Sequence, residues 1–240
     1  MANSWFQFKR FKISQEHAAM KISTDACIFG AWLNTLFKDE MFEVLDVGTG
    51  TGLLSLMFLQ ENPGSRVWAL EPEAAAAQDA LANFERSGWK DNIILETVTL
   101  GEFAQKSEKR FDLVISNPPF FQNQLKAERR DRNMARHDAL PPGELAEGAW
   151  RLANAEGFLA VIYPDTVWKA WTKAAEAQGW HLWHQLNILP APHKAVNRIC
   201  GVFGRRRTGH APLVTPLLIR EGHQYTGRFK SLLQPYYLNL

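Results

Sequence analysis

The chain has few of the features that mark secreted or membrane proteins. Its 240 residues include only two cysteines, Cys27 and Cys200, which lie far apart and form no C-x-x-C pattern. We expect both to be buried, reduced thiols, which excludes a disulfide-stapled scaffold. No apolar run approaches the roughly twenty residues of a membrane span, and Lys9, Arg10 and Lys12 precede any long apolar run. We therefore expect a soluble, cytoplasmic protein without a membrane partner.

The sequence also lacks a strong charge imbalance, internal repeats and low-complexity tracts. Its net charge of +2 and pI of about 8.5 neither require nor exclude nucleic acid, so that local clusters must carry such an argument. With 46% hydrophobic residues the chain can bury a full core. We expect one domain over residues 1–240, with small additions at 1–40 and 208–240.

What the sequence does have is a regular alternation of strand-like and helical patterns. Strands are predicted at residues 43–47, 66–71, 92–96, 111–116 and 158–163, followed by an antiparallel hairpin formed by 180–188 and 198–205. Helices are predicted at 53–60, 73–86, 143–154 and 165–178, the third of them closed by Gly157. This alternation predicts an α/β fold, a mostly parallel sheet with helices on both faces.

A glycine-rich turn follows the first of these strands. Asp46 precedes the turn Gly48-Thr49-Gly50-Thr51-Gly52, and Glu71 follows the next strand about twenty residues later, where a carboxylate can accept bonds from ribose hydroxyls. The layout is Rossmann-like. The spacing is G-x-G-x-G, whereas a pyrophosphate needs G-x-G-x-x-G. An acid near the turn suits the ammonium and sulfonium of S-adenosylmethionine, which we favour over NAD as the cofactor.

The tetrapeptide Asn117-Pro118-Pro119-Phe120 follows the fourth strand and suits the binding of a planar amine. The side-chain carbonyl of Asn117 and the backbone carbonyl of Pro118 can each accept one N–H of an exocyclic amino group. The prolines remove competing backbone donors, and Phe120 can stack on the ring that carries the amine. The pattern predicts methylation of a nitrogen on a base or an amide, against the plainer interpretation of a turn that leaves a strand.

The motifs LDVGTGTG, LEPE and NPPF together resemble those of class I S-adenosylmethionine-dependent methyltransferases. Two flanking stretches are more specific: FKRFKISQEHAAMKISTDACIFGAW near the N-terminus and YTGRFKSLL near the C-terminus. With Ala135-Arg136-His137 after the tetrapeptide, they resemble the bacterial tRNA1(Val) adenine N6-methyltransferase family.

This resemblance implies a seven-stranded sheet of order 3-2-1-4-5-7-6 and methylation of N6 of adenine 37, beside the anticodon. It also implies that residues 1–40 close over the cofactor, so that Lys21, Thr24 and Asp25 line its methionine end. The residues alone favour a core-packing helix with a loop for that segment. The chain departs from the family after the third strand, where Thr99 stands at the usual place of an acid that holds the cofactor adenine.

The cofactor and substrate sites should lie together, because ligands of open α/β sheets bind at the carboxyl ends of the strands. The predicted cofactor set is Lys21, Thr24, Asp25, Asp46, Gly48, Gly50, Gly52, Glu71, Thr99 and Asn117. The predicted contacts to tRNA follow the tetrapeptide in a basic segment: Phe121, Lys126, Arg129, Arg130, Arg132, Arg136 and His137. Two further candidates for RNA contact are Arg205-Arg206-Arg207 and the N-terminal cations among aromatic residues.

Several alternatives stay open from sequence alone. The same chemistry suits guanine N2 of ribosomal RNA or a protein glutamine amide, and a non-catalytic RNA-binding module or an NAD-dependent oxidoreductase are more distant possibilities. His181 and His184 suggest a metal pair, but no carboxylate cluster accompanies them, and we expect no metal. The sequence does not predict an oligomeric state.

Overall fold

The computed structural model describes residues 4–17, 21–118 and 140–240, and its centre is an eight-stranded sheet. From one edge to the other the strands run β10-β8-β9-β7-β6-β3-β4-β5. The parallel core consists of β3 (Glu43–Val47), β4 (Arg66–Leu70), β5 (Ile93–Glu96), β6 (Phe111–Ser116) and β7 (Ala153–Pro164). The strands β8 (His181–Leu189) and β9 (Arg198–Gly204) form an antiparallel pair, and β10 (Leu213–Leu218) lies parallel to β8.

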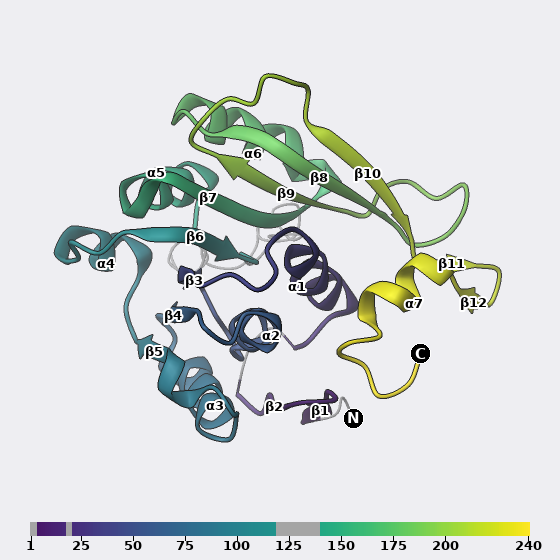
Figure 1. Cartoon of the computed structure of the whole chain (residues 1–240), viewed down its shortest axis with the longest axis horizontal. Helices are drawn as coiled ribbons and strands as arrows, with labels where there is room; N and C mark the ends of the chain where they lie inside the picture. The colour runs from purple at the N-terminus through teal and green to yellow at the C-terminus, as the bar shows by residue number, and fades with distance from the viewer. Residues whose placement is uncertain (1–3, 18–20, 119–139) are drawn as a thin grey trace, which may run out of the picture.

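Helices cover both faces of this sheet (Figure 1). One layer contains α1 (Thr24–Leu36), α2 (Leu53–Glu61) and α3 (Ala74–Glu85), and the other contains α4 (Leu100–Lys106), α5 (Pro142–Leu152) and α6 (Asp165–Ala177). Each layer has its own buried apolar cluster against the sheet. A short 3-10 turn, Lys90–Asn92, leads into β5. The predicted fold class is therefore confirmed.

The predicted strand order 3-2-1-4-5-7-6 is also confirmed, for β3 to β9. The main sheet has one strand more than predicted. Residues 213–218 add β10 beyond β8, with Leu213 opposite His184 and Leu218 opposite Leu189. The strand contains Pro216, which cannot donate a ladder hydrogen bond and suits an edge position. The terminal addition at 208–240 thus contributes to the main sheet.

Gly157 does not close a helix, and that prediction is wrong. The helix α5 ends at Leu152 and β7 begins at the next residue. Between the pairs Phe111–Ala153 and Leu113–Phe158 the register shifts, so that β7 bulges. A Cβ at Gly157 would lie 3.0 Å from the backbone oxygen of Phe111. The glycine therefore permits a close backbone approach at the bulge.

The two ends of the chain meet on the α1 and α2 side of the sheet. The strands β1 (Trp5–Gln7) and β2 (Lys12–Ser14) form a hairpin, and Phe8 in the turn between them forms a bridge with Tyr237. The C-terminal part forms the small pair β11 (Arg220–Glu221) and β12 (Gln224–Tyr225) and then α7 (Gly227–Leu233). Figure 1 shows both termini on this side.

Residues that the sequence placed in the core are buried as expected. Both cysteines are free and buried, and burial raises the pKa of the Cys27 thiol to about 12. In α1, every residue from Ala26 to Asn34 is buried, so this part of the N-terminal segment is a core-packing helix. No helix among the described residues is long and apolar enough to cross a membrane.

A buried amide network ties α1 to α2 and to the C-terminal tail. The side-chain amide of Asn34 donates to the carbonyl oxygen of Met57 and to the hydroxyl of Tyr236, each at 2.8 Å. Its oxygen accepts from Asn62 at 3.0 Å. Such groups are costly when they lose their partners away from water.

We expect Asn34→Ala to lower the free energy of unfolding by about 2–3 kcal/mol, because it removes three buried hydrogen bonds, to Met57, Tyr236 and Asn62. Urea unfolding monitored by circular dichroism measures this. The control is Thr35→Ala on the same helix, which removes one local hydroxyl bond to Trp32 and should cost less than about 1 kcal/mol. Equal losses in the two variants would contradict the prediction.

Candidate cofactor and methyl-acceptor site

The glycine turn after β3 has one open side and one packed side. Gly48 and Gly50 have φ of +70° and +58°, and a Cβ built on either would meet no atom within 4 Å. Gly52 has φ of +80°, but a Cβ there would lie 2.3 Å from the Phe84 ring. The first two glycines therefore leave room for a ligand, whereas the third lets α2 begin against α3.

Asp46 lies beneath this turn and is only 1% exposed. Its Oδ2 accepts hydrogen bonds from the hydroxyls of Thr49 at 2.7 Å and Ser55 at 2.6 Å. Its Oδ1 is buried and has no hydrogen-bond partner among the described residues. Burial raises the pKa of this carboxyl from 3.8 to about 6, although the two hydroxyls oppose the shift. An unpaired buried acceptor next to an open turn fits a cationic or donor ligand.

Glu71 follows β4 and faces the same turn. Its Oε2 accepts from the Gly50 amide at 2.8 Å, and its Oε1 accepts from the Glu73 amide at 3.1 Å. Burial raises the pKa of the carboxyl, and these two amides work against that shift. Each carboxylate oxygen can accept a second bond, so Glu71 is held in place and retains acceptor capacity for two hydroxyls.

Asn117 lies beside the glycine turn because β3 and β6 are neighbours. Val47 pairs with Ser116 in the parallel ladder, so that Gly48 and Asn117 are the next residues on strands about 4.8 Å apart. The Ser116 hydroxyl donates to the carbonyl oxygen of Val47 at 2.8 Å and closes the two strand ends together. Asn117 is half-buried and Pro118 is buried. Sequence reasoning missed Ser116; its signal was a polar residue ending an apolar strand.

The N-terminal candidates lie near this edge, but one of them has a partner. Thr24 begins α1 and, like Lys21, is exposed. The Asp25 carboxylate lies 3.4 Å from Nε of Arg198 at the start of β9. Because Arg198 pairs with Pro164 at the end of β7, this ion pair belongs to the edge that holds Asn117. The pKa of Asp25 is raised, because burial outweighs the opposing effect of the Arg198 charge.

Thr99 has a structural role in the described chain. Its hydroxyl accepts from the Glu102 amide at 3.2 Å, and the Glu102 carboxylate accepts from the Thr99 amide at 2.9 Å. This capping box begins α4. It also explains the lowered pKa of Glu102, which follows from hydrogen bonds that Thr99 donates. The predicted contact of Thr99 with the cofactor adenine stays a prediction.

The remaining predicted residues lie outside the described residues. They are Pro119, Phe120, Phe121, Lys126, Arg129, Arg130, Arg132, Arg136 and His137. Their predicted roles at the methyl acceptor and in RNA contact stay predictions. Among the described residues no group of three or more His, Cys, Asp or Glu side chains is arranged to hold a metal ion.

Sequence reasoning also missed Asn83, which joins the N-terminal segment to the glycine turn. Its side-chain oxygen accepts from the Ser14 amide at 2.8 Å, and its amide donates to the carbonyl oxygens of Ser14 and Thr51, each at 2.9 Å. One turn earlier on α3, Asp79 accepts from the backbone amide of His17 at 2.8 Å. Two buried polar residues four apart in an Ala-rich helix were the available signal.

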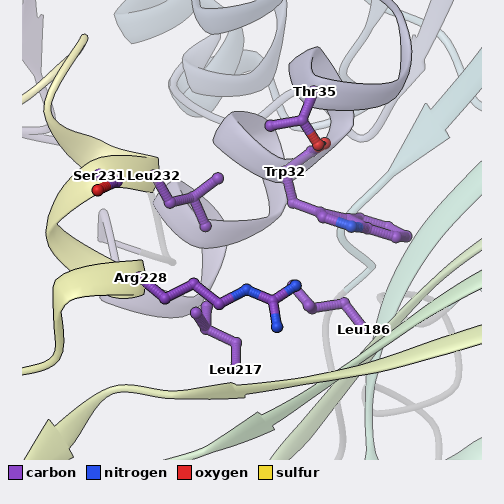
Figure 2. Close-up of a pocket in the computed structure, with 7 residues that line it drawn as sticks. All are labelled: Trp32, Thr35, Leu186, Leu217, Arg228, Ser231 and Leu232. Atoms are coloured by element: carbon purple, nitrogen blue, oxygen red, sulfur yellow. The ribbon is translucent and has the colours of Figure 1, made fainter.

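A cavity of about 280 Å³ lies elsewhere, between α1, β8, β10 and α7. Figure 2 shows Trp32, Leu186 and Leu217 along its wall and the Arg228 side chain reaching across it. The Arg228 guanidinium donates to the carbonyl oxygen of Pro216 at 2.7 Å. None of the seven lining residues belongs to the predicted site, so we do not assign the cofactor to this cavity.

Comparison with known proteins identifies the family of this chain. Residues 30–139 match the methyltransferase small domain family. A tRNA1(Val) (adenine(37)-N6)-methyltransferase of Dyadobacter fermentans is 36% identical over 240 residues, which cover 98% of each chain. The protein of the same name from Bacteroides thetaiotaomicron is 36% identical over the full length of both chains. The chain belongs to the tRNA1(Val) (adenine(37)-N6)-methyltransferase family.

Solved structures agree on the fold. A methyltransferase from Pyrococcus furiosus aligns with a TM-score of 0.55 and 16% identity, covering 79% of this chain and 90% of its own. A protein of Agrobacterium tumefaciens, described as a predicted O-methyltransferase, aligns with a TM-score of 0.67 over 90% of this chain and all of its own, at 16% identity. The chain thus shares the fold of these two proteins.

The different roles of two glycines predict separable effects of two substitutions. Gly50→Ala puts a methyl group into the open side of the turn, so we expect about tenfold weaker S-adenosylmethionine binding by calorimetry, with roughly 1 kcal/mol lost from stability. Gly52→Ala forces the Phe84 ring to move and should cost about 2–3 kcal/mol in thermal unfolding. Strong cofactor binding by Gly50→Ala would contradict an open, ligand-facing turn.

The raised pKa of Asp46 predicts a pH dependence of stability. The folded chain holds a proton on Asp46 up to about pH 6, whereas the unfolded chain releases it near 3.8. The contribution of this proton to the free energy of unfolding is therefore fully present below pH 4 and is lost as the pH rises through 6. Relative to the parent, Asp46→Asn should gain about 2 kcal/mol between pH 4.5 and 8 in cofactor-free urea unfolding. A constant difference across that range would show that Asp46 titrates normally.

Proposed function

We propose that this chain transfers the methyl group of S-adenosylmethionine to N6 of adenine 37 in tRNA1(Val). The observation that carries the proposal is the β3–β6 register, which sets Asn117 beside the open side of Gly48 and Gly50. Further support comes from the name shared by relatives that match the whole chain. A carbonyl-rich strand end next to a cofactor turn suits an amine acceptor.

The chain holds the cofactor through its backbone turn and two carboxylates. Gly48 and Gly50 let the backbone approach the cofactor closely. The Glu71 carboxylate accepts hydrogen bonds from the ribose hydroxyls of the cofactor, and the unpaired oxygen of Asp46 attracts its ammonium group. The cofactor, when bound, supplies a methyl group on a positively charged sulfur. Lys21, Thr24 and Asp25 lie at the methionine end, and Thr99 stands near the adenine.

Asn117 and Pro118 then orient the amine of the target base. The lone pair of N6 is delocalised into the adenine ring and is a poor nucleophile. Two carbonyl oxygens that hold the N–H bonds out of the ring plane favour a pyramidal nitrogen whose lone pair points at the methyl group. After transfer the nitrogen sheds a proton to water or to an acceptor already in contact. No dedicated base is required.

Access to N6 requires the base to leave its stack, which is cheaper in an anticodon loop than in a duplex. We propose that Phe120 stacks on the extruded adenine, with Pro119 in the same turn and Phe121 beside it. The RNA backbone would be held by the basic segment that follows, at Lys126, Arg129, Arg130, Arg132, Arg136 and His137.

We infer that the N-terminal segment covers the cofactor within a single domain of residues 1–240. Support comes from Asn83, whose side chain bonds to Ser14 of this segment and to Thr51 of the glycine turn. Asn83 thereby joins the N-terminal segment to the glycine turn.

The acceptor role of Asn117 gives the sharpest test. With labelled S-adenosylmethionine and tRNA, we expect Asn117→Ala to lower kcat by about 10³-fold, because the amine loses one of two orienting acceptors. Cofactor affinity by calorimetry should change less than about threefold. Asn187→Ala on β8 is the matched control, and its activity should equal that of the parent.

Nucleoside analysis of the product distinguishes the proposed acceptor from others. The label should appear as N6-methyladenosine at position 37. Label on guanine or on protein would disprove the substrate assignment, and full turnover by Asn117→Ala would disprove the role of its side chain.

A further inference from the structure

A cluster of cations lies at the end of the sheet opposite Asn117, where no part of the proposed reaction takes place. Arg110 precedes β6, Arg151 lies in the last turn of α5, and Arg205, Arg206 and Arg207 follow β9. Because β6 and β7 are parallel and β9 is antiparallel to them, these positions share the amino-end edge. We call these five residues the arginine edge.

Arg205 fixes the geometry of the arginine edge. Its guanidinium donates to the carbonyl oxygen of Ala153 at 2.9 Å and stacks on the Trp150 ring, with 3.9 Å between Cζ and the ring centroid. Burial lowers the pKa of Arg205, and the nearby charge of Arg110 lowers it further. Two cations thus stand close enough to repel each other, an arrangement that a bound anion would relieve.

The remaining arginines face outward. Arg110, Arg151, Arg206 and Arg207 are exposed, and the Arg110 guanidinium bonds to the backbone carbonyls of Glu108 and Lys109. Lys109 lies over the Trp68 ring, 4.1 Å from its centroid, and adds a sixth positive charge.

The acidic groups nearby do not balance this charge. Of four carboxylates close to the edge, Glu156 pairs with Arg206, Asp112 accepts bonds from the Glu43 amide and the Asn154 side chain, and Glu43 is half-buried. Glu108 is exposed. The arginine edge with Lys109 therefore keeps a net positive charge.

We propose that the arginine edge binds phosphates of the tRNA body, away from the target base. This rests on the proposed function, which makes tRNA the substrate. Planar guanidinium groups suit phosphate oxygens. Five arginines and Lys109 gather on this edge, which favours a hydrophilic polyanion.

The length of β6 separates the two contacts. Its six residues span roughly 20 Å at about 3.3 Å per residue, so one nucleotide cannot reach both ends. A tRNA is long enough to contact the arginine edge while adenine 37 lies beside Asn117. The edge contributes affinity for the RNA and takes no part in methyl transfer.

The test uses Arg110→Gln/Arg207→Gln, which spares the packed Arg205. The control Lys173→Gln/Lys230→Gln removes the same charge from exposed lysines on α6 and α7. We expect the Kd for whole tRNA at 100 mM salt to rise about tenfold in the first variant alone. The slope of log K against log salt should decrease in magnitude by about 1–2. The kcat at saturating tRNA and the affinity for S-adenosylmethionine should equal those of the parent.

The proposal would be overturned by a tRNA affinity and salt slope like those of the parent, or by an equal loss in the control. A fall in kcat or cofactor affinity would also overturn it, because the edge would then act through the fold. Failure of the proposed function is a separate result. It would appear as tRNA that the parent binds but does not methylate, and the binding measurements would still decide the role of the edge.

Discussion

The pairing of β3 with β6 is the constraint on which the rest of this site depends. Opposite Val47 stands Ser116, whose hydroxyl bonds to the Val47 carbonyl. A slip of one residue would turn the side chains of either strand to the other face of the sheet. The register therefore decides both the apolar packing and the proximity of Gly48 to Asn117, two residues almost seventy positions apart.

Around that contact, polar groups are arranged so that the turn is rigid while acceptors remain. One carboxylate oxygen of Asp46 accepts hydrogen bonds from Thr49 and Ser55, and the other is unpaired among the described residues. Glu71 accepts two backbone amides and still has lone pairs to offer. The raised pKa of each carboxyl reflects burial without a positive partner in contact. A ligand that brings positive charge and hydroxyl groups would satisfy both.

The two ends of the chain are also anchored to the rest of the fold. The N-terminal hairpin packs beside the C-terminal tail through Phe8 and Tyr237, and Asn34 joins α1 and α2 to Tyr236. Asp25 at the start of α1 contacts Arg198 of β9. The segment that we propose to cover the cofactor is thus anchored to the C-terminal tail and to β9.

The sequence by itself determined the α/β class, the parallel strands β3 to β7, the hairpin β8–β9 and the order of the chemistry along the chain. These signals are local: apolar runs, a glycine turn, and an acid or asparagine at the end of a strand. Local pattern misassigned Gly157, whose role depends on the Phe111 carbonyl of another strand, and it missed β10, which has exposed residues and a proline. Only the tertiary structure decided that Gly52 serves packing while Gly48 and Gly50 face open space, that Thr99 caps a helix, and that Arg110 and Arg205 stand together. The physical reason is that each of these properties is a distance between residues remote in sequence, which periodicity does not encode.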